Sequence, residues 1–142
     1  MDKITLSYYN THAQDFVQGT VGVDFHITQD RFLAQLPAGA KILDFGCGSG
    51  RDTKYFLERG FAVEATDGSA ELCKLASEHT GISVKQMLFD ELDAVAKYDG
   101  IWACASILHL AWKDLVVVMQ IMVRAVKGEG AVSYTHLRAH ET

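Results

Sequence analysis

The sequence predicts a three-layer α/β sandwich built around a mainly parallel sheet. Apolar runs of strand length alternate along the chain with segments whose apolar residues recur at three- and four-residue steps. Such alternation requires crossover connections, which pair the strands in parallel and place the helices on the faces of the sheet. The 142 residues, 49% of them hydrophobic and 22% charged, are enough for one globular domain.

The first third of the chain is expected to be helical. The apolar residues that share one helical face there are Leu6, Tyr9, Ala13, Phe16 and Val17. A glycine- and valine-containing stretch at 19–23 interrupts this pattern, and a second helix is expected over 28–36. Pro37 should end that helix, because proline disfavours helical geometry in the residue before it.

Strands and helices alternate after Pro37. Strands are expected over 41–45, 61–67, 82–87 and 100–106. A helix that begins at 53 should stop at Gly60, since glycine readily adopts the left-handed geometry that follows many helices. Ser69 is the expected N-cap of the next helix. That helix carries three apolar residues on one side, namely Leu72, Leu75 and Ala76.

The segment 113–127 admits two interpretations. Val116, Val117 and Val118 favour a strand locally, but the segment is longer than a normal strand and contains several polar residues. We interpret it as a helix, because a set of apolar residues shares one helical face: Leu115, Met119, Met122 and Val126. Gly128 is expected to end this helix, and a last extended segment to begin at Ala131.

Charge and cysteine content restrict the partners that we expect. The net charge of −5 argues against a nucleic acid or a membrane surface as the partner, because both need a basic patch. No apolar run approaches the ~20 residues of a membrane span. Three widely spaced cysteines, Cys47, Cys73 and Cys104, suit the reducing cytoplasm better than disulfides, and no metal-ligand spacing is present. Cytoplasmic localisation and no bound metal are therefore expected.

A glycine-rich turn after the first strand predicts a cofactor site. Gly46, Gly48 and Gly50 let the backbone approach a ligand closely, and the helix that follows offers free N–H groups. Asp67 ends the second strand, where its carboxylate can accept both hydroxyls of a ribose. Arg51 stands where the dinucleotide fingerprint GxGxxG has its third glycine, and no Gly-Lys-Ser/Thr ending is present. The pattern therefore indicates a nucleoside-containing cofactor other than a dinucleotide or nucleoside triphosphate.

Residues 42–50 (ILDFGCGSG) together with 67–69 (DGS) resemble class I S-adenosylmethionine-dependent methyltransferases. Within that family, residues 50–52 (GRD) and the helical N-terminus resemble small bacterial enzymes grouped with tellurite-resistance methyltransferases. The resemblance covers residues 3–131 and implies a Rossmann-like fold with S-adenosylmethionine as the cofactor.

The resemblance also implies which residues hold the cofactor. Asp44 and the glycine backbone, with Cys47 between the glycines, would hold the methionine part, and Asp67 would bind the ribose. The residues placed around the adenine are Gly68, Ser69, Leu88 and Phe89. Leu88 occupies the place of the acid that the family usually has at that turn. Ala105 and Ser106 would line the site near the sulfonium.

Two further side chains are candidates for a direct role in methyl transfer. Tyr9, with Tyr8 second, is the aromatic residue expected to face the sulfonium, unless it serves only in helix packing. His109 follows the fourth strand, where the acceptor should enter, and is the catalytic candidate either as a base or as a residue that shapes the pocket. A purely structural role for His109 is the alternative.

The last eleven residues are expected not to belong to the domain. Residues 132–142 lack a clear period, and codons can be chosen for them that spell a sequencing-library adapter. The family fold carries seven strands, so the resemblance implies an incomplete sheet of about five. We therefore expect a truncated methyltransferase domain over 1–131 and a non-native tail over 132–142.

The function predicted from these features is methyl transfer from S-adenosylmethionine to a small-molecule or metalloid acceptor in a bacterial cytoplasm. One alternative is a nicotinamide-dependent oxidoreductase, which Arg51 disfavours. The other is a cofactor-binding remnant without activity. The sequence does not indicate the acceptor or the oligomeric state.

Overall fold

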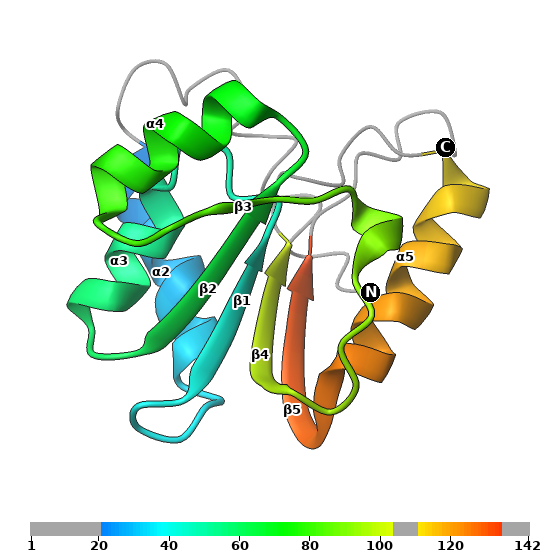
Figure 1. Cartoon of the computed structure of the whole chain (residues 1–142). Helices are drawn as coiled ribbons and strands as arrows, with labels where there is room; N and C mark the ends of the chain where they lie inside the picture. The colour runs from blue at the N-terminus through cyan, green and yellow to red at the C-terminus, as the bar shows by residue number, and fades with distance from the viewer. Residues whose placement is uncertain (1–20, 104–110, 135–142) are drawn as a thin grey trace.

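The structure is a computed structural model that describes residues 21–103 and 111–134. Its elements in chain order are α2 (Val21–Leu33), β1 (Lys41–Phe45), α3 (Arg51–Glu58), β2 (Ala62–Asp67), α4 (Ala70–Thr80), β3 (Lys85–Gln86), η2 (Phe89–Glu91), β4 (Tyr98–Ala103), α5 (Trp112–Ala125) and β5 (Val126–Tyr134). The strands form one sheet in the order β3-β2-β1-β4-β5, and every neighbouring pair is parallel (Figure 1). This arrangement confirms the predicted α/β fold with a parallel sheet.

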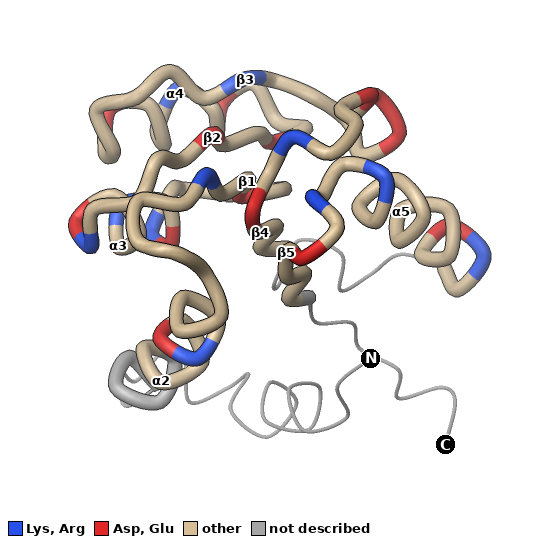
Figure 2. Tube along the Cα trace, turned by 90° about the horizontal axis from the view of Figure 1, so that it is seen from below, with Lys and Arg blue, Asp and Glu red and all other residues tan. Residues whose placement is uncertain are grey.

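Helices cover both faces of the sheet. In Figure 2, α2, α3 and α4 lie to the left of the strands and α5 lies to the right. On the first face, Phe32 of α2 and Phe56 of α3 pack against Trp102 of β4, with ring centroids 5.1 and 5.3 Å from the indole. The strand β1 lies between the helices on the two faces of the sheet, and its residues 42–45 are almost fully buried. A strand buried on both faces is mainly apolar, and apart from Asp44 the buried residues of β1 are, which explains why this segment was predictable.

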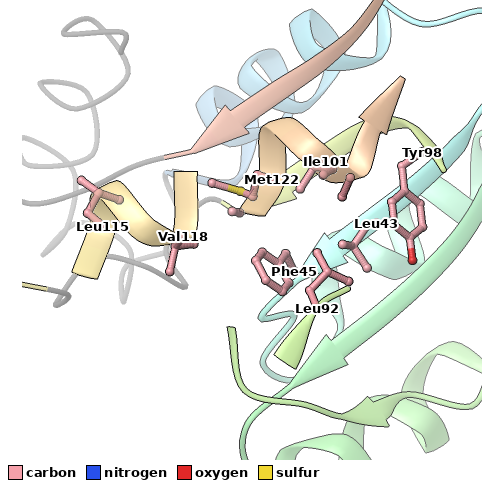
Figure 3. Packing of buried hydrophobic residues seen from close by; sticks show 10 residues of the cluster. Leu43, Phe45, Leu92, Tyr98, Ile101, Leu115, Val118 and Met122 are labelled. Atoms are coloured by element: carbon pink, nitrogen blue, oxygen red, sulfur yellow. The ribbon is translucent and has the colours of Figure 1, made fainter. Parts of the chain in front are cut away.

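The opposite face carries the larger core (Figure 3). Leu43 and Phe45 of β1 meet Ile101 of β4 and the buried side of α5. The α5 residues in this core are Leu115, Val118, Met122 and Ala125. The helical interpretation of this segment is therefore correct, because its apolar side chains recur at helical spacing and face the sheet.

Local sequence signals fix the ends of α3 and α4. The helix α3 follows Gly50, which has a left-handed conformation, and it stops before Gly60 at φ 91°. The hydroxyl of Ser69 accepts a hydrogen bond from the N–H of Leu72 at 3.2 Å, which confirms Ser69 as the N-cap of α4. The buried residues of α4 are Cys73 and Ala76, whereas Leu75 is 54% exposed, contrary to expectation.

Two predicted boundaries before β4 were wrong. The helix α2 begins at Val21 and not at 28, so residues 21–23 belong to the helix, although they were expected to interrupt the helical pattern. It ends at Leu33 and not at 36. The predicted strand over 82–87 is reduced to Lys85 and Gln86, both exposed. Only these two residues pair with β2, and β3 lies at the edge of the described sheet.

The boundary between α5 and β5 also differs from the prediction. The strand begins at Val126, immediately after the helix, so Gly128 lies in the strand and does not end the helix. Residues 127–130 form an irregular stretch opposite Asp99, between the pairs Tyr98–Val126 and Gly100–Ala131. A Cβ on Gly130 would lie 2.6 Å from the Asp99 carbonyl oxygen, which explains a glycine at this bulge. The strand continues through Val132 to Tyr134, across the boundary expected at residue 131.

Positive and negative side chains are mixed along the described elements, in keeping with the modest net charge of −5. Figure 2 shows lysines and arginines interspersed with acidic residues along the described elements. None of the helices in the described part of the chain is long and apolar enough to cross a membrane.

Candidate functional site

The glycine-rich loop joins β1 to α3 at the carboxyl edge of the sheet. Gly46, Gly48 and Gly50 all have positive φ angles, of 81°, 59° and 91°. The loop is fastened to the neighbouring strand, because the N–H groups of Gly46 and Cys47 both donate to the carbonyl of Thr66, at 2.9 and 2.8 Å. The edge where a ligand binds in parallel α/β sheets is thus formed by a loop of fixed geometry.

Asp67 joins this loop to the turn that follows β2. Its Oδ2 accepts a hydrogen bond from the N–H of Gly48 at 2.8 Å, and its Oδ1 accepts one from the N–H of Ser69 at 2.9 Å. Each carboxylate oxygen can accept more than one hydrogen bond, so both retain capacity for a ligand hydroxyl. The structure therefore brings the two halves of the predicted site, the loop and Asp67, into direct contact.

Two of the loop glycines serve different purposes. Among the described residues, no atom lies within 4 Å of a Cβ built on Gly48, so their packing leaves the space beside it open. A Cβ on Gly50 would lie 2.8 Å from Thr80 Cγ2 and 3.2 Å from Ala76 Cβ, so Gly50 allows α4 to approach the loop. Open space beside a left-handed glycine at the edge of the sheet is the geometry that a closely approaching ligand requires.

Asp44 lies beneath the loop and is only 2% exposed. Its Oδ2 accepts a hydrogen bond from the hydroxyl of Thr53 at 2.6 Å. Burial raises the pKa of Asp44 well above its usual range, the nearby Asp52 carboxylate raises it further, and the Thr53 hydrogen bond opposes both effects. A buried acid of this kind is stabilised in its ionised form by a cationic ligand.

The thiol of Cys47 is not activated. Burial is the main cause that raises the pKa of Cys47 above its usual range, and the charges of Asp44 and Asp67 act in the same direction. A thiol that resists ionisation is a poor nucleophile. Cys47 packs against the cluster formed by Ala65, Cys73, Ala76 and Val84, as expected for a small core residue.

Of the residues predicted to surround the adenine, Gly68 and Leu88 lie close together. A Cβ on Gly68 would lie 3.3 Å from Leu88 Cδ2, so the turns after β2 and β3 meet there, and Leu88 is 58% exposed. The Gln86 amide donates to the Gly68 carbonyl at 3.3 Å. Phe89 instead contacts the core, with its ring 4.9 Å from that of Phe45.

Several predicted residues lie outside the described part of the chain. These are Tyr8, Tyr9, Ala105, Ser106 and His109, and their roles remain predictions. Among the described residues, no group of three or more histidine, cysteine or acidic side chains is placed to hold a metal ion.

The sequence reading missed a buried polar network beside the loop. Asp52 accepts hydrogen bonds from Gln29 of α2 and Trp102 of β4, at 2.6 and 2.9 Å. Arg51 Nε also lies 3.6 Å from Asp52 Oδ1. The only local signal was an acid in the first turn of α3, a position that helices favour for any acidic residue.

Comparison with known proteins identifies relatives over most of the chain. Residues 42–130 match the family described as "Methyltransferase domain". A malonyl-[acyl-carrier protein] O-methyltransferase of Enterobacter lignolyticus is 31% identical over 117 residues, which cover 78% of this chain and 45% of that protein. A 2-methyl-6-phytyl-1,4-hydroquinone methyltransferase of a Synechocystis strain is 29% identical over 137 residues, 91% of this chain and 42% of that protein. The chain thus spans less than half the length of these two relatives.

Solved structures agree in fold. A TehB-like S-adenosylmethionine-dependent methyltransferase from Corynebacterium glutamicum superposes with a TM-score of 0.59 at 23% identity, covering 87% of this chain and 72% of that one. The PH0226 protein from Pyrococcus horikoshii superposes with a TM-score of 0.71 at 19% identity, covering 90% and 65%. At these identities the likeness concerns the fold, a Rossmann-like parallel sheet between helices.

Proposed function

Because the chain belongs to the methyltransferase domain family, we propose that it binds S-adenosylmethionine at the glycine loop and transfers the methyl group to a small-molecule acceptor. The observation that carries this proposal is the position of the Asp67 carboxylate, between the N–H groups of Gly48 and Ser69. A ribose bound there would donate its hydroxyls to an acid that is already fixed in orientation. Charge-assisted hydrogen bonds of this kind contribute roughly 1.5–3 kcal/mol each.

The residues present fit the charge of this cofactor. Asp44 is buried, and its hydrogen-bonding partner, Thr53, is neutral. A ligand ammonium group beside Asp44 would supply the positive charge that favours its ionised form. The open space beside Gly48 would admit the methionine part close to the backbone. Gly68 and Leu88 would border the adenine.

When bound, S-adenosylmethionine supplies a methyl group already activated on a sulfonium, so the protein needs no strong nucleophile of its own. The protein's part is to align the acceptor with the methyl group and to exclude water. The unactivated Cys47 thiol is compatible with this division of work. We assign Tyr9, with Tyr8 second, to the sulfonium by cation–π attraction, Ala105 and Ser106 to its surroundings, and His109 to the acceptor side.

The acceptor class is a separate part of the proposal. The two sequence relatives are named for a malonyl group on a carrier protein and for a phytylated hydroquinone, so relatives at this distance differ in acceptor. We propose a small molecule or a metalloid as the acceptor of this chain. The fold similarity to a TehB-like methyltransferase at 23% identity is compatible with either.

Isothermal titration calorimetry with three ligands tests the proposal. S-adenosylmethionine and S-adenosylhomocysteine should bind at one site per chain, and NAD should not. Binding of NAD alone would overturn the proposal in favour of a nicotinamide-dependent oxidoreductase. Tight binding of S-adenosylmethionine with no transfer of its labelled methyl group to candidate acceptors would favour a cofactor-binding domain without activity.

A further inference from the structure

Asp52 connects three elements that are distant in the sequence. It is the second residue of α3, and its Oδ1 accepts a hydrogen bond from Gln29 Nε2 on α2 at 2.6 Å. Its Oδ2 accepts one from Trp102 Nε1 on β4 at 2.9 Å. Both oxygens therefore act as acceptors toward groups on different elements, a role that the carboxylate form fills and a neutral side chain fills only in part.

The two donors have no access to water in place of Asp52. The side chains of Gln29 and Trp102 are both 0% exposed. A buried donor without a partner costs more than the hydrogen bond itself contributes, because it also loses its hydration. The position of α2 relative to β4 is therefore sensitive to the acceptor at residue 52.

The network continues along α2. Gln29 Oε1 lies 2.7 Å from Nδ1 of His26, and the His26 ring stacks on Tyr55 of α3 with centroids 4.6 Å apart. Two successive turns of α2 are thus held against α3 by one connected set of contacts. Its most buried members are Gln29 and Trp102, which meet at Asp52.

Asp52 also adjoins the cofactor loop. It follows Gly50 by two residues, and its neighbour Thr53 donates to the buried Asp44 at 2.6 Å. Consecutive residues in the first turn of α3 therefore face two places: Thr53 holds the acid under the loop, and Asp52 holds α2. A structural change in the first turn of α3 therefore affects both Asp44 and α2.

We propose that Asp52 is a positioning residue whose carboxylate couples the docking of α2 to the geometry of the glycine loop. The inference rests on the proposed function, because it makes S-adenosylmethionine the ligand that senses this coupling. Cofactor bound at the loop stabilises the docked α2, and release of α2 weakens cofactor binding. A merely structural Asp52 would lower overall stability without linking the two segments.

A reversed hydrogen-bonding pair tests the proposal. In Asp52→Asn, only one acceptor oxygen remains for two donors, so an N–H of Gln29 or Trp102 loses its partner. Adding Gln29→Glu reverses the polarity of one bond. The new amide nitrogen at position 52 then donates to the new carboxylate at position 29, while the new amide oxygen accepts from Trp102. Rescue of a single variant by the second substitution also guards against general misfolding.

The readouts are the affinity for S-adenosylmethionine by calorimetry and amide hydrogen exchange of α2 with and without that ligand. In the unaltered protein, the ligand should slow exchange in α2. Asp52→Asn should weaken binding about tenfold and abolish this slowing, and the double variant should restore both. Tyr55→Phe is the matched control. It keeps the ring that stacks on His26 and removes only the exposed hydroxyl, which donates to Asp30 of α2 and accepts from Arg59. Because the hydrogen bonds of Asp52 stay intact, this variant should keep the ligand effect.

Two results overturn the inference. One is an Asp52→Asn protein that melts earlier yet keeps the affinity and the ligand-induced slowing of the unaltered protein. The other is a ligand-free Asp52→Asn protein in which amide exchange speeds up in α2 but not in the loop over 46–50. A change confined to α2 would show that the two segments are not coupled. Failure of the unaltered protein to bind S-adenosylmethionine would instead overturn the proposed function, and the ligand-free comparison would still decide the coupling.

Discussion

The carboxylate of Asp67 accepts the N–H of Gly48 at 2.8 Å, which ties the end of β2 to the loop that follows β1. The same acid therefore shapes the loop and presents its remaining lone pairs to a ligand. Because Oδ1 is held by Ser69 at the same time, the carboxylate cannot rotate freely. The predicted ribose acid is thus oriented before any ligand arrives, which lowers the entropic cost of binding.

Asp67→Ala should weaken binding of S-adenosylmethionine by about tenfold to a hundredfold, the range expected for losing charge-assisted hydrogen bonds. Glu64→Gln is the matched control, because Glu64 lies on the same strand but bonds to Tyr98. Calorimetry of the two variants measures the difference. An Asp67→Ala protein that binds as tightly as the control would refute the placement of the ribose.

Two alanine substitutions should separate the roles of the loop glycines. Gly48→Ala places a Cβ in open space and costs about 1 kcal/mol of stability for its left-handed backbone, but it should obstruct the cofactor. Gly50→Ala forces a Cβ to within 2.8 Å of Thr80 Cγ2 and should destabilise by about 1–3 kcal/mol. Urea unfolding and cofactor titration of both variants check this. Equal effects of the two substitutions in both assays would contradict it.

Much of the fold was predictable because it depends on local patterns. The buried strand β1 was predicted at its observed bounds, since an apolar run followed by glycines has few other interpretations. The end of α5 was not, because Gly128 is a helix-stop signal in sequence but lies in a bulge opposite Asp99. Whether a glycine ends a helix or permits a bulge depends on the neighbouring strand.

The sequence pointed to the loop glycines and Asp67 as site candidates, but not to the hydrogen bonds that connect the elements around them. Asp67 and Gly48 are 19 residues apart, and Asp52 is 23 residues from Gln29 and 50 from Trp102. No local motif contains these pairs. The parallel pairing of β1 with β2 brings Asp67 to the loop, and the packing of α2, α3 and β4 brings Asp52 to Gln29 and Trp102. Gln29 in particular lies among exposed residues in the sequence of α2, and only the fold reveals that it is buried.

Asp44→Asn should stabilise the ligand-free protein at neutral pH. Burial raises the pKa of Asp44 in the folded state above its value of about 4 in an unfolded chain. The fold therefore loses stability as the pH rises from about 4 through this higher pKa, and an uncharged amide avoids the loss. We expect the Tm to rise by a few degrees at pH 8, and by less at pH 4, while cofactor affinity falls. Thermal melts at both values measure this, and a lower Tm at pH 8 would contradict it.

At acid pH, the stability of the fold should depend on Glu64 in the sense opposite to Asp44, because the charged form of Glu64 is the one that stabilises. Burial alone would raise its pKa, but the hydrogen bonds from Tyr98 and Lys41 outweigh burial and hold the pKa below its usual value. Its contribution is therefore present above about pH 4.5 and is lost as the pH falls through the lowered value. Glu64→Gln should lower the Tm relative to the unaltered protein at pH 7. This difference in Tm should be smaller at pH 3. A difference independent of pH would show that packing, and not charge, is lost.

Shortening the chain should reveal which residues β5 needs. The strand pairs Val132 with Ile101, Ser133 with Trp102 and Tyr134 with Ala103, so three residues of the proposed non-native tail complete its ladder. A chain that ends at residue 131 loses these pairs and uncovers one edge of β4 beside the buried Ile101 and Trp102. We expect it to melt several degrees below the 142-residue chain, whereas a chain that ends at residue 134 should melt close to it. Equal Tm values for the 131- and 134-residue chains would mean that the strand pairs beyond Ala131 do not stabilise the fold. The stabilising part of the strand would then end at residue 131.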